Sequence, residues 1–419
     1  MARMESSPPE PAPPSVPTEE AYAPPFAPHG VARCRHFGWC GGCARQNLPY
    51  EEQVALKTSE LNALLGDYAA VLKPMETGPS PWFYRNKMEF AFGFERGELA
   101  IGLRRKGKFF GVVRLEECFL MHEAVGAVLA AVRDWTTAHT WPPYHLRRHQ
   151  GLLRYVVMRD GKRSGELLVM LVTAPPAEPT VPGGPAAFEA TLDELARRLA
   201  PLGVTSLLWC VTDRQADLAV GEIRKTVLGH PWLEEHQSGF TYKLSPYAFF
   251  QPNVVLAERL GERAGEMLGG PWPVLVDLYC GVGGLTLPLS KRVGRAIGVE
   301  VEGAAVEDAG RNAALNGVTT VQFVAEDSLT FLRRFSNYSF LADRWAVTLD
   351  PPRAGMHPKM AAQLLRVAPP VILYVSCNPK KLVEDLGILT RDYRLEEAVP
   401  FDFFPHTPHV EVLAKLVRR

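Results

Sequence analysis

The chain has 419 residues, of which 47% are hydrophobic and 22% charged, the values of an ordinary globular protein. This length predicts roughly two or three domains, and no apolar run reaches the roughly 18–20 residues that a membrane-spanning helix needs. Lys plus Arg and Asp plus Glu both number 46, so net charge does not indicate a nucleic-acid partner, and a site for RNA must come from local clusters of basic residues.

The N-terminal segment, residues 1–30, is rich in proline and has almost no aliphatic side chains. Since proline lacks a backbone donor and the segment has little to bury, we predict a disordered tail. The N-terminus also lacks the charged-then-apolar pattern of a secretion signal, so we expect a cytoplasmic location.

Residues 31–75 begin with a cysteine-rich segment that predicts a metal site. Cys34, Cys40 and Cys43 lie within "CRHFGWCGGC", and three thiolates need a fourth ligand to close a tetrahedral site or to hold a four-iron cluster. Cys118, in "LEECFLMHEAV", is the candidate fourth ligand. Spacing alone leaves zinc and an iron–sulfur cluster equally open, because both accept four cysteine sulfurs.

A helix and a β-rich region follow the cysteines. In "YEEQVALKTSELNALLG" the apolar side chains of Val54, Leu61 and Leu65 fit one helical face. Residues 76–245 alternate short apolar runs with Gly and Pro turns, and a helical repeat runs from 188 to 199. We therefore expect a β-rich α+β central domain over residues 76–245.

Residues 246–419 predict a second domain, in which strand, loop and helix alternate. That rhythm is typical of a Rossmann-like α/β domain with a mostly parallel, doubly wound sheet. Its helices are expected at 285–292, 303–316, 358–367 and 379–390. Ligands of such sheets bind beyond the carboxyl ends of the strands, where this chain has Asp277, Glu300, Asp327, Asp350 and Cys377.

The first of these strand ends, "DLYCGVGG", predicts a nucleotide-like ligand. Its glycines permit a tight turn, and Glu300 follows 23 residues after Asp277, close to the spacing of an acid that binds ribose. Thr286 stands where a third, phosphate-contacting glycine would fall. A cofactor with a ribose and no pyrophosphate fits better, which favours S-adenosylmethionine, with Asp327 as an acceptor for the adenine amino group.

Two further elements suggest the chemistry. "LDPPRAG" and "VSCNP" end two strands of one sheet, and Glu411 stands in an apolar strand, where a carboxylate is costly unless it is paired or functional. Methylation of uracil at C5 needs a thiol that adds to C6 and a base that removes the C5 proton. Cys377 and Glu411 would supply these two groups.

Together, "FFQPN", "DLYCGVGG", "LDPPRAG", "VSCNP" and "FPHTPHVEVL" resemble the RNA uracil-C5 methyltransferases over residues 31–419. The resemblance implies Cys377 as nucleophile and Glu411 as proton acceptor. It implies contacts to S-adenosylmethionine from Gln251, Tyr279, Glu300 and Asp350, with Asp327 in addition. "CRHFGWCGGCARQNLPYEEQ" resembles the motif of the ribosomal RNA branch, which implies a [4Fe-4S] cluster held by Cys34, Cys40, Cys43 and Cys118.

The resemblance makes RNA the expected partner and the central domain, residues 76–245, the part that binds it. The expected substrate is 23S rRNA, with tRNA as the alternative. Two basic stretches, 102–111 and 144–159, carry aromatic or histidine neighbours. Arg104, Arg105, Lys106 and Lys108 are candidates for phosphate contacts, and Phe109 or Phe110 for stacking on a base. We expect a monomer that binds neither DNA nor membrane. Two other functions stay open: an enzyme that methylates amino groups through "DPP", and an iron–sulfur RNA-binding factor.

Overall fold

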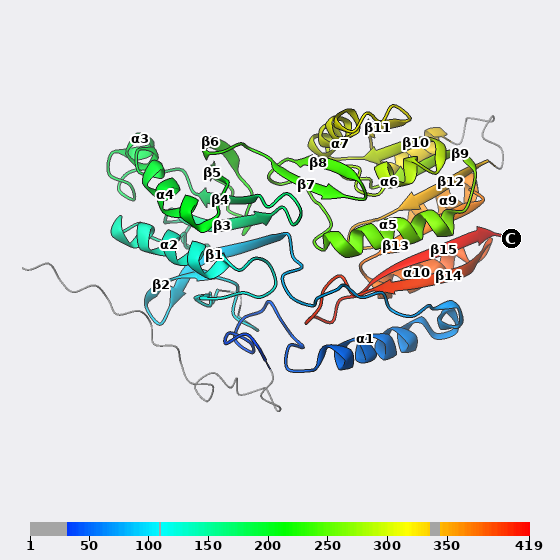
Figure 1. Ribbon diagram of the computed structural model, residues 1–419, viewed down its shortest axis with the longest axis horizontal. Coiled ribbons are helices and arrows are strands. Elements are labelled where there is room, and N and C mark those ends of the chain that lie inside the picture. Colours follow the sequence, from blue (N-terminus) through cyan, green and yellow to red (C-terminus); the bar gives the residue numbers. More distant parts are fainter. Residues whose placement is uncertain (1–31, 109, 336–343) are drawn as a thin grey trace, which may run out of the picture.

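The computed structural model describes residues 32–108, 110–335 and 344–419, which form two sheet-based halves side by side (Figure 1). The tail expected at 1–30 and the stacking candidate Phe109 lie outside the described residues. In the described part of the chain, no helix is both long and apolar enough to cross a membrane.

The first half is built on a six-stranded sheet in the order β2-β1-β3-β4-β5-β6, in which only β4 and β5 pair in parallel. Its strands are β1 (Lys87–Glu95), β2 (Glu98–Gly102), β3 (Leu153–Asp160), β4 (Leu167–Thr173), β5 (Ser206–Val211) and β6 (Glu222–Leu228). Every residue of β3 and β4 is buried, so both faces of the sheet are covered. Three helices cover one face: α2 (Val125–Ala138), α3 (Gly184–Glu189) and α4 (Leu192–Leu199).

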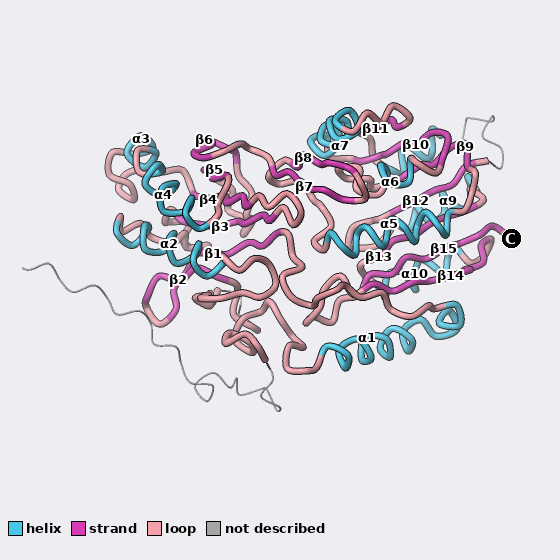
Figure 2. The backbone as a smooth tube through the Cα atoms, in the orientation of Figure 1, coloured by secondary structure: helices cyan, strands magenta, loops and turns pink. Residues whose placement is uncertain are grey.

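A two-stranded hairpin covers the other face and lies between the two halves (Figure 2). Its strands are β7 (Leu233–Gln237) and β8 (Phe240–Leu244). Leu233, Phe240 and Tyr242 are buried in one cluster with residues of both large sheets. The hairpin therefore joins the two halves through a shared apolar core, which fixes their relative position.

The second half is a seven-stranded sheet in the order β11-β10-β9-β12-β13-β15-β14. The first five strands in this order pair in parallel, and β15 and β14 add an antiparallel edge. The strands are β9 (Trp272–Leu278), β10 (Val293–Glu300), β11 (Val321–Ala325), β12 (Trp345–Leu349), β13 (Val371–Ser376), β14 (Tyr393–Phe401) and β15 (Glu411–Arg418). The sheet confirms the predicted mostly parallel, Rossmann-like fold.

Helices pack on both faces of this second sheet, as a doubly wound fold requires. One face is covered mainly by α1 (Tyr50–Leu65), α8 (Ser328–Phe335), α9 (Pro358–Val367) and α10 (Pro379–Leu389). The other is covered mainly by α5 (Val254–Leu268) and α6 (Thr286–Ser290). Helix α7 (Gly303–Leu315) lies beside β8 and β11.

The four helices expected in the C-terminal domain are confirmed, whereas α2, α5 and α8 were not anticipated. The repeat expected from 188 to 199 is two helices, because the chain turns at Thr191, whose hydroxyl donates to the Phe188 carbonyl. Helix α1 is confirmed, but its expected apolar face is wrong in part. Its buried side chains are Gln53, Lys57, Leu61 and Leu65, and Val54 is only half-buried.

Candidate active site

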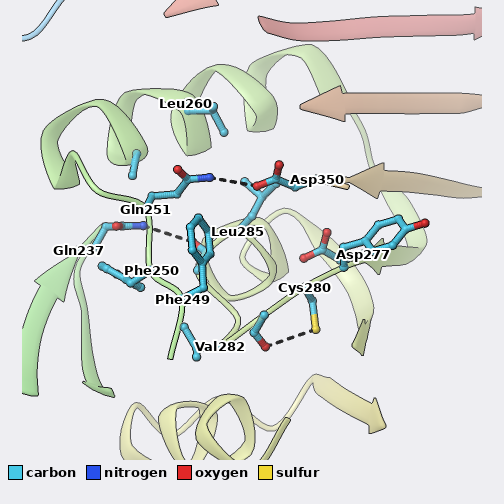
Figure 3. A pocket seen from close by; sticks show the side chains of 14 residues that line it. Gln237, Phe249, Phe250, Gln251, Leu260, Asp277, Cys280, Val282, Leu285 and Asp350 are labelled. Carbon is cyan, nitrogen blue, oxygen red and sulfur yellow. Dashed lines mark hydrogen bonds between the residues drawn. The ribbon is translucent and has the colours of Figure 1, made fainter. Parts of the chain in front are cut away.

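A pocket lies at the carboxyl ends of β9 and β12, on either side of the point where the strand order reverses (Figure 3). This is the position at which doubly wound sheets bind their ligands. Its empty volume of about 590 Å³, open solvent at its mouth included, suits a cofactor-sized molecule. It is lined by Gln237, Phe249, Phe250, Gln251, Ala257, Leu260, Asp277, Tyr279, Cys280, Gly281, Val282, Gly284, Leu285 and Asp350.

Asp277 fixes the loop that forms the floor of this pocket. Its buried carboxylate accepts hydrogen bonds from Thr286 Oγ1 at 2.5 Å and Thr348 Oγ1 at 2.6 Å. Burial raises the pKa of Asp277 to about 6, although both hydroxyls oppose this shift by stabilising the charged form. The aspartate thus ties the start of α6 to the neighbouring strand β12.

Glu300 holds the glycine turn in place. Its Oε2 accepts from the backbone N–H of Gly281 at 3.2 Å, and its Oε1 accepts from the N–H groups of Val301 and Glu302. The turn needs this support because Tyr279 has a φ of 62°, a left-handed conformation that non-glycine residues rarely adopt. The strain presents the Tyr279 ring at the pocket wall.

Gln251 and Asp350 meet across the pocket, where Gln251 Nε2 donates to Asp350 Oδ2 at 3.0 Å (Figure 3). Gln251 is held there because Asn253 caps α5 and Asn86 Nδ2 donates to the Gln251 carbonyl at 2.8 Å. Its own Oε1 is buried and has no hydrogen-bond partner in the described part of the chain. A buried acceptor in this state suits a ligand donor such as an amino group.

The thiol of Cys377 and the carboxylate of Glu411 come from adjacent antiparallel strands. Ser376 of β13 is the register partner of Val412 of β15, so one more step in the same register sets Cys377 opposite Glu411. Burial, followed by the nearby carboxylates of Glu411 and Asp350, raises the pKa of Cys377 to about 11. A second antiparallel partner, β14, pairs Phe401 with Glu411 and fixes the carboxylate from the other side.

Glu411 is a buried carboxylate with an unsatisfied hydrogen-bond acceptor. It is 4% exposed, and its Oε2 has no hydrogen-bond partner among the residues described. Burial, followed by the nearby Asp350, raises its pKa well above the usual range of a glutamate. Burial also raises the pKa of Asp350, to about 7. A cation bound among these carboxylates would favour their charged forms.

The loop before Glu411 is held by helix α1 through a buried ion pair. Lys57 Nζ donates to Asp402 Oδ1 at 2.5 Å, and both side chains are 0% exposed. The same ammonium donates to the carbonyl oxygens of Phe404 at 3.0 Å and His409 at 3.1 Å. Lys57 therefore donates all three of its hydrogen bonds to residues 402–409. This segment leads into the strand of Glu411.

The cysteine-rich segment also contacts the loop before Glu411, residues 402–409. The backbone N–H groups of Ala44 and Arg45 donate to the His406 carbonyl at 2.8 and 3.0 Å. The His406 ring stacks on Trp82 at 4.0 Å, and Gln53 Oε1 accepts from its backbone N–H. Burial lowers the pKa of His406 to about 4, so the ring is neutral at physiological pH.

The four cysteines predicted as ligands line one cavity. Cys34, Cys40, Cys43 and Cys118 gather there, although no group of three or more His, Cys, Asp or Glu side chains within residues 32–108, 110–335 and 344–419 has the arrangement of a metal site. Gly42 N–H donates to Cys40 Sγ at 3.3 Å and Gln46 Nε2 to Cys43 Sγ at 3.5 Å. Burial raises the pKa of both these thiols to about 12.

Two of the predicted cofactor contacts have other partners in the structure. Glu300 and Asp327 are not among the pocket-lining residues, and Asp327 caps α8 by accepting from the Thr330 N–H at 2.9 Å. Gln251, Tyr279 and Asp350 do line the pocket together. Sequence patterns gave no signal for Gln237, whose buried Oε1 also has no partner among the described residues. Phe249, which opens the "FFQPN" motif, also lines the pocket and is 68% exposed.

Comparison with known proteins identifies the family. Residues 224–419 match the family model described as tRNA (Uracil-5-)-methyltransferase. A relative from Nitratidesulfovibrio vulgaris, described as an uncharacterized RNA methyltransferase, is 37% identical over 392 residues, which cover 91% of this chain and 82% of that protein. The tRNA (uracil(54)-C(5))-methyltransferase of Pyrococcus horikoshii is 33% identical over 388 residues, covering 92% of this chain and 86% of that protein.

A solved structure agrees with these relatives. The crystal structure of the Pyrococcus abyssi tRNA (uracil-54, C5)-methyltransferase in complex with S-adenosyl-L-homocysteine superposes with a TM-score of 0.72 and 29% identity, covering 90% of this chain and 86% of that one. Similarity of fold and of sequence extends over most of the chain. The protein belongs to the RNA uracil-C5 methyltransferase family and is an S-adenosylmethionine-dependent enzyme.

Proposed function

We propose that this enzyme methylates C5 of a uridine in structured RNA, with Cys377 as nucleophile and Glu411 as general base. The observation that carries the proposal is the register that sets Cys377 opposite Glu411, with Asp350 of the cofactor pocket beside both. A thiol and a carboxylate on adjacent strands can act on one substrate in two steps. The thiol adds to the ring, and the carboxylate removes the proton whose loss precedes elimination of the thiol.

The reaction balances with these two groups. The Cys377 thiolate forms a bond to C6 of uracil, and the resulting enolate attacks the methyl group of S-adenosylmethionine, which leaves as S-adenosylhomocysteine. Glu411 then takes the C5 proton, and the sulfur–C6 bond breaks to release 5-methyluridine and the thiolate. Burial and two nearby carboxylates disfavour the thiolate form of Cys377. The positive charge of the sulfonium of the methyl donor, bound nearby, would favour the thiolate.

The RNA class is open between two proposals. The motif resemblance favours 23S rRNA, whereas the Pyrococcus relatives are named for uridine 54 of tRNA. Purified protein, methyl-labelled S-adenosylmethionine and unmodified transcripts of each RNA would separate them after digestion to nucleosides. We expect labelled 5-methyluridine from one transcript class. Label in a methylated amino group of adenine would instead support the "DPP" alternative.

Gln251 is proposed as a cofactor contact. Gln251→Leu removes both the buried acceptor and the hydrogen bond to Asp350, so we expect the Kd for S-adenosylhomocysteine to rise about 10-fold or more, as for removal of a hydrogen bond to a charged group. Isothermal titration calorimetry measures it. Gln363→Leu is the matched control. Gln363, in α9, is also buried, and its amide donates to the backbone carbonyl of Leu332 in α8. Equal affinities of the two variants would contradict the assignment.

We further propose that Cys34, Cys40, Cys43 and Cys118 hold a [4Fe-4S] cluster. The donor set fits, because four thiols line one cavity and two of their sulfurs already accept N–H hydrogen bonds, which stabilise cluster thiolates. Bound iron would displace the thiol protons and supply structural cross-linking of this segment.

Iron and sulfide content after anaerobic purification tests the cluster. Cys118→Ser is expected to lose most of the iron and the visible absorbance. Cys210→Ser should keep both, because Cys210 is buried in the core of β5. Stoichiometric zinc without sulfide would favour the zinc alternative, and iron retained in full by Cys118→Ser would remove Cys118 from the ligand set.

A further inference from the structure

A groove on the first half of the molecule combines exposed aromatic rings with arginines. We call it the aromatic groove; it is lined by Phe92, Gly93, Phe94, Arg104, Phe110, Pro143, Tyr144, His145, Leu146, Arg147, Arg148, Arg154, Tyr155 and Asp217. The fold therefore brings the two basic stretches of the sequence, 102–111 and 144–159, to one surface.

Two of the aromatic rings that line this groove are exposed to solvent. Phe94 is 59% exposed and Phe110 is 46% exposed, although phenylalanine is normally buried. The guanidinium of Arg147 lies 4.3 Å from the centre of the Phe110 ring, and that of Arg154 lies 4.3 Å from the Tyr144 ring. Exposed rings with cations beside them are the features of a platform on which nucleic-acid bases stack.

The charge of the groove is strongly positive. Its lining has four arginines against one aspartate, Asp217. That aspartate forms an ion pair with Arg104 and accepts from the Tyr155 hydroxyl, so the net positive charge of the groove comes from Arg147, Arg148 and Arg154. Arg154 is 4% exposed and donates to the carbonyl oxygens of Arg214 and Ala216, which are neutral acceptors and leave its charge in place. A polyanion is the partner that this surface attracts.

A second cavity shares one lining residue, Arg104, with the aromatic groove. The second cavity, here the inner cavity, is also lined by Arg85, Lys87, Thr407 and His409, and His409 lies two residues before Glu411. Buried Arg85 Nε has no hydrogen-bond partner within the described residues. Basic side chains thus follow one path from the exposed rings to the loop of the proposed base.

We propose that the aromatic groove binds an unpaired nucleotide of the RNA substrate, distant from the target uridine, by stacking on Phe94 and Phe110. The connecting phosphates run past Arg104 into the inner cavity. This inference rests on the proposed function for the identity of the RNA, but its binding test does not depend on turnover. The groove selects RNAs that carry a second unpaired base at the right distance from the methylated one.

Fluorescence anisotropy of the full chain with labelled oligouridine of about 20 nucleotides, longer than the site of a typical single-strand binding fold, tests the stacking. Phe94→Leu and Phe110→Leu keep an apolar side chain and remove the ring, so each is expected to weaken binding about 10-fold, on the scale of one base–aromatic stack. Phe94→Tyr keeps the ring and should bind as the wild type does. A blunt RNA duplex of the same length should bind all four proteins alike.

The arginines are tested by salt dependence. Arg147→Ala/Arg148→Ala should lower the slope of log K against log salt by about 0.7 for each phosphate that the variant no longer neutralises. Arg197→Ala/Arg198→Ala is the matched control, because this variant removes the same charge from α4, outside the groove. Equal slopes for the two double variants would overturn the phosphate contacts.

The outcomes separate this inference from the proposed function. Weaker oligouridine binding by the leucine variants supports the groove even where no RNA is methylated, a result that would overturn the function alone. If 5-methyluridine forms and the leucine variants bind oligouridine and use RNA with unchanged affinity and KM, the groove is wrong and the function stands. Wild-type protein that does not bind oligouridine also overturns the groove, and would direct attention to an acidic protein partner.

Discussion

Cys377→Ala is expected to abolish methyl transfer, with turnover falling by about 10⁴-fold or more, the scale on which removal of a catalytic nucleophile acts. The physical reason is that C5 of uracil is a weak nucleophile until a thiolate adds to C6. RNA that contains 5-fluorouridine provides the direct measurement. Fluorine cannot leave as a proton does, so the wild-type enzyme should stall as a methylated protein–RNA adduct that survives denaturation.

The control for this experiment is Cys210→Ala, which removes a thiol that is buried in the first sheet. It should form the adduct as the wild type does, whereas Cys377→Ala should form none while still binding S-adenosylhomocysteine. An adduct that persists in Cys377→Ala would refute the nucleophile. Retained turnover without any adduct would support the amino-methylating mechanism, which needs no thiol.

Breaking the contact between α1 and residues 402–409, the loop before Glu411, is expected to slow the last step of the proposed reaction. Lys57→Met removes three hydrogen bonds to residues 402–409 and leaves Asp402 buried without its cationic partner, with only the Tyr50 hydroxyl still donating to its carboxylate. Removal of one member of a buried ion pair costs about 3–5 kcal/mol of stability. Because the loop positions Glu411, the adduct on ordinary uridine RNA should form and then accumulate, as expected for Glu411→Gln.

A second variant separates positioning from stability. Lys57→Met/Asp402→Leu replaces the ion pair with apolar side chains, a change that is often neutral or stabilising. Its thermal unfolding should return toward the wild-type value, yet the carbonyls of Phe404 and His409 still lack their donor, so the adduct should still accumulate. If the double variant regains stability and releases 5-methyluridine at the normal rate, Lys57 serves folding alone.

The loop before Glu411, residues 402–409, also contacts the cysteine-rich segment. Ala44 and Arg45 donate to His406, and Gly41 N–H donates to the Arg104 carbonyl at 2.9 Å, so the segment touches both the loop and the proposed RNA path. A cluster that cross-links this segment would therefore support two walls of the inner cavity without any redox step in methyl transfer.

Local patterns were sufficient for several of the conclusions. The alternation of strands and helices after residue 246 predicted the parallel sheet, because each buried strand must be followed by a helix that covers it. The apolar surroundings of Glu411 marked a carboxylate with a special role, and the structure places it opposite Cys377. Cysteine spacing likewise predicted which thiols share a cavity, since chain geometry holds Cys40 and Cys43 together.

Long-range contacts decided the rest. Asp327 and Glu300 stand at strand ends as cofactor ligands would, and spacing could not show that one also caps a helix and that the other also supports a turn. Lys57 reads as a surface residue of an amphipathic helix, because lysine is almost never fully buried unless paired. Its partner Asp402 lies 345 residues away, so only the folded chain shows that the helix buries a charge.

The sequence by itself determined the family and the fold of the C-terminal half, and it supplied the proposal for the thiol and the base, because motifs and periodicity are local properties of the chain. The tertiary structure alone decided which residues line the cofactor pocket, what holds the loop before Glu411, and that two separate basic stretches form one groove. Those features depend on contacts between distant segments, and such contacts follow from the packing of the whole core.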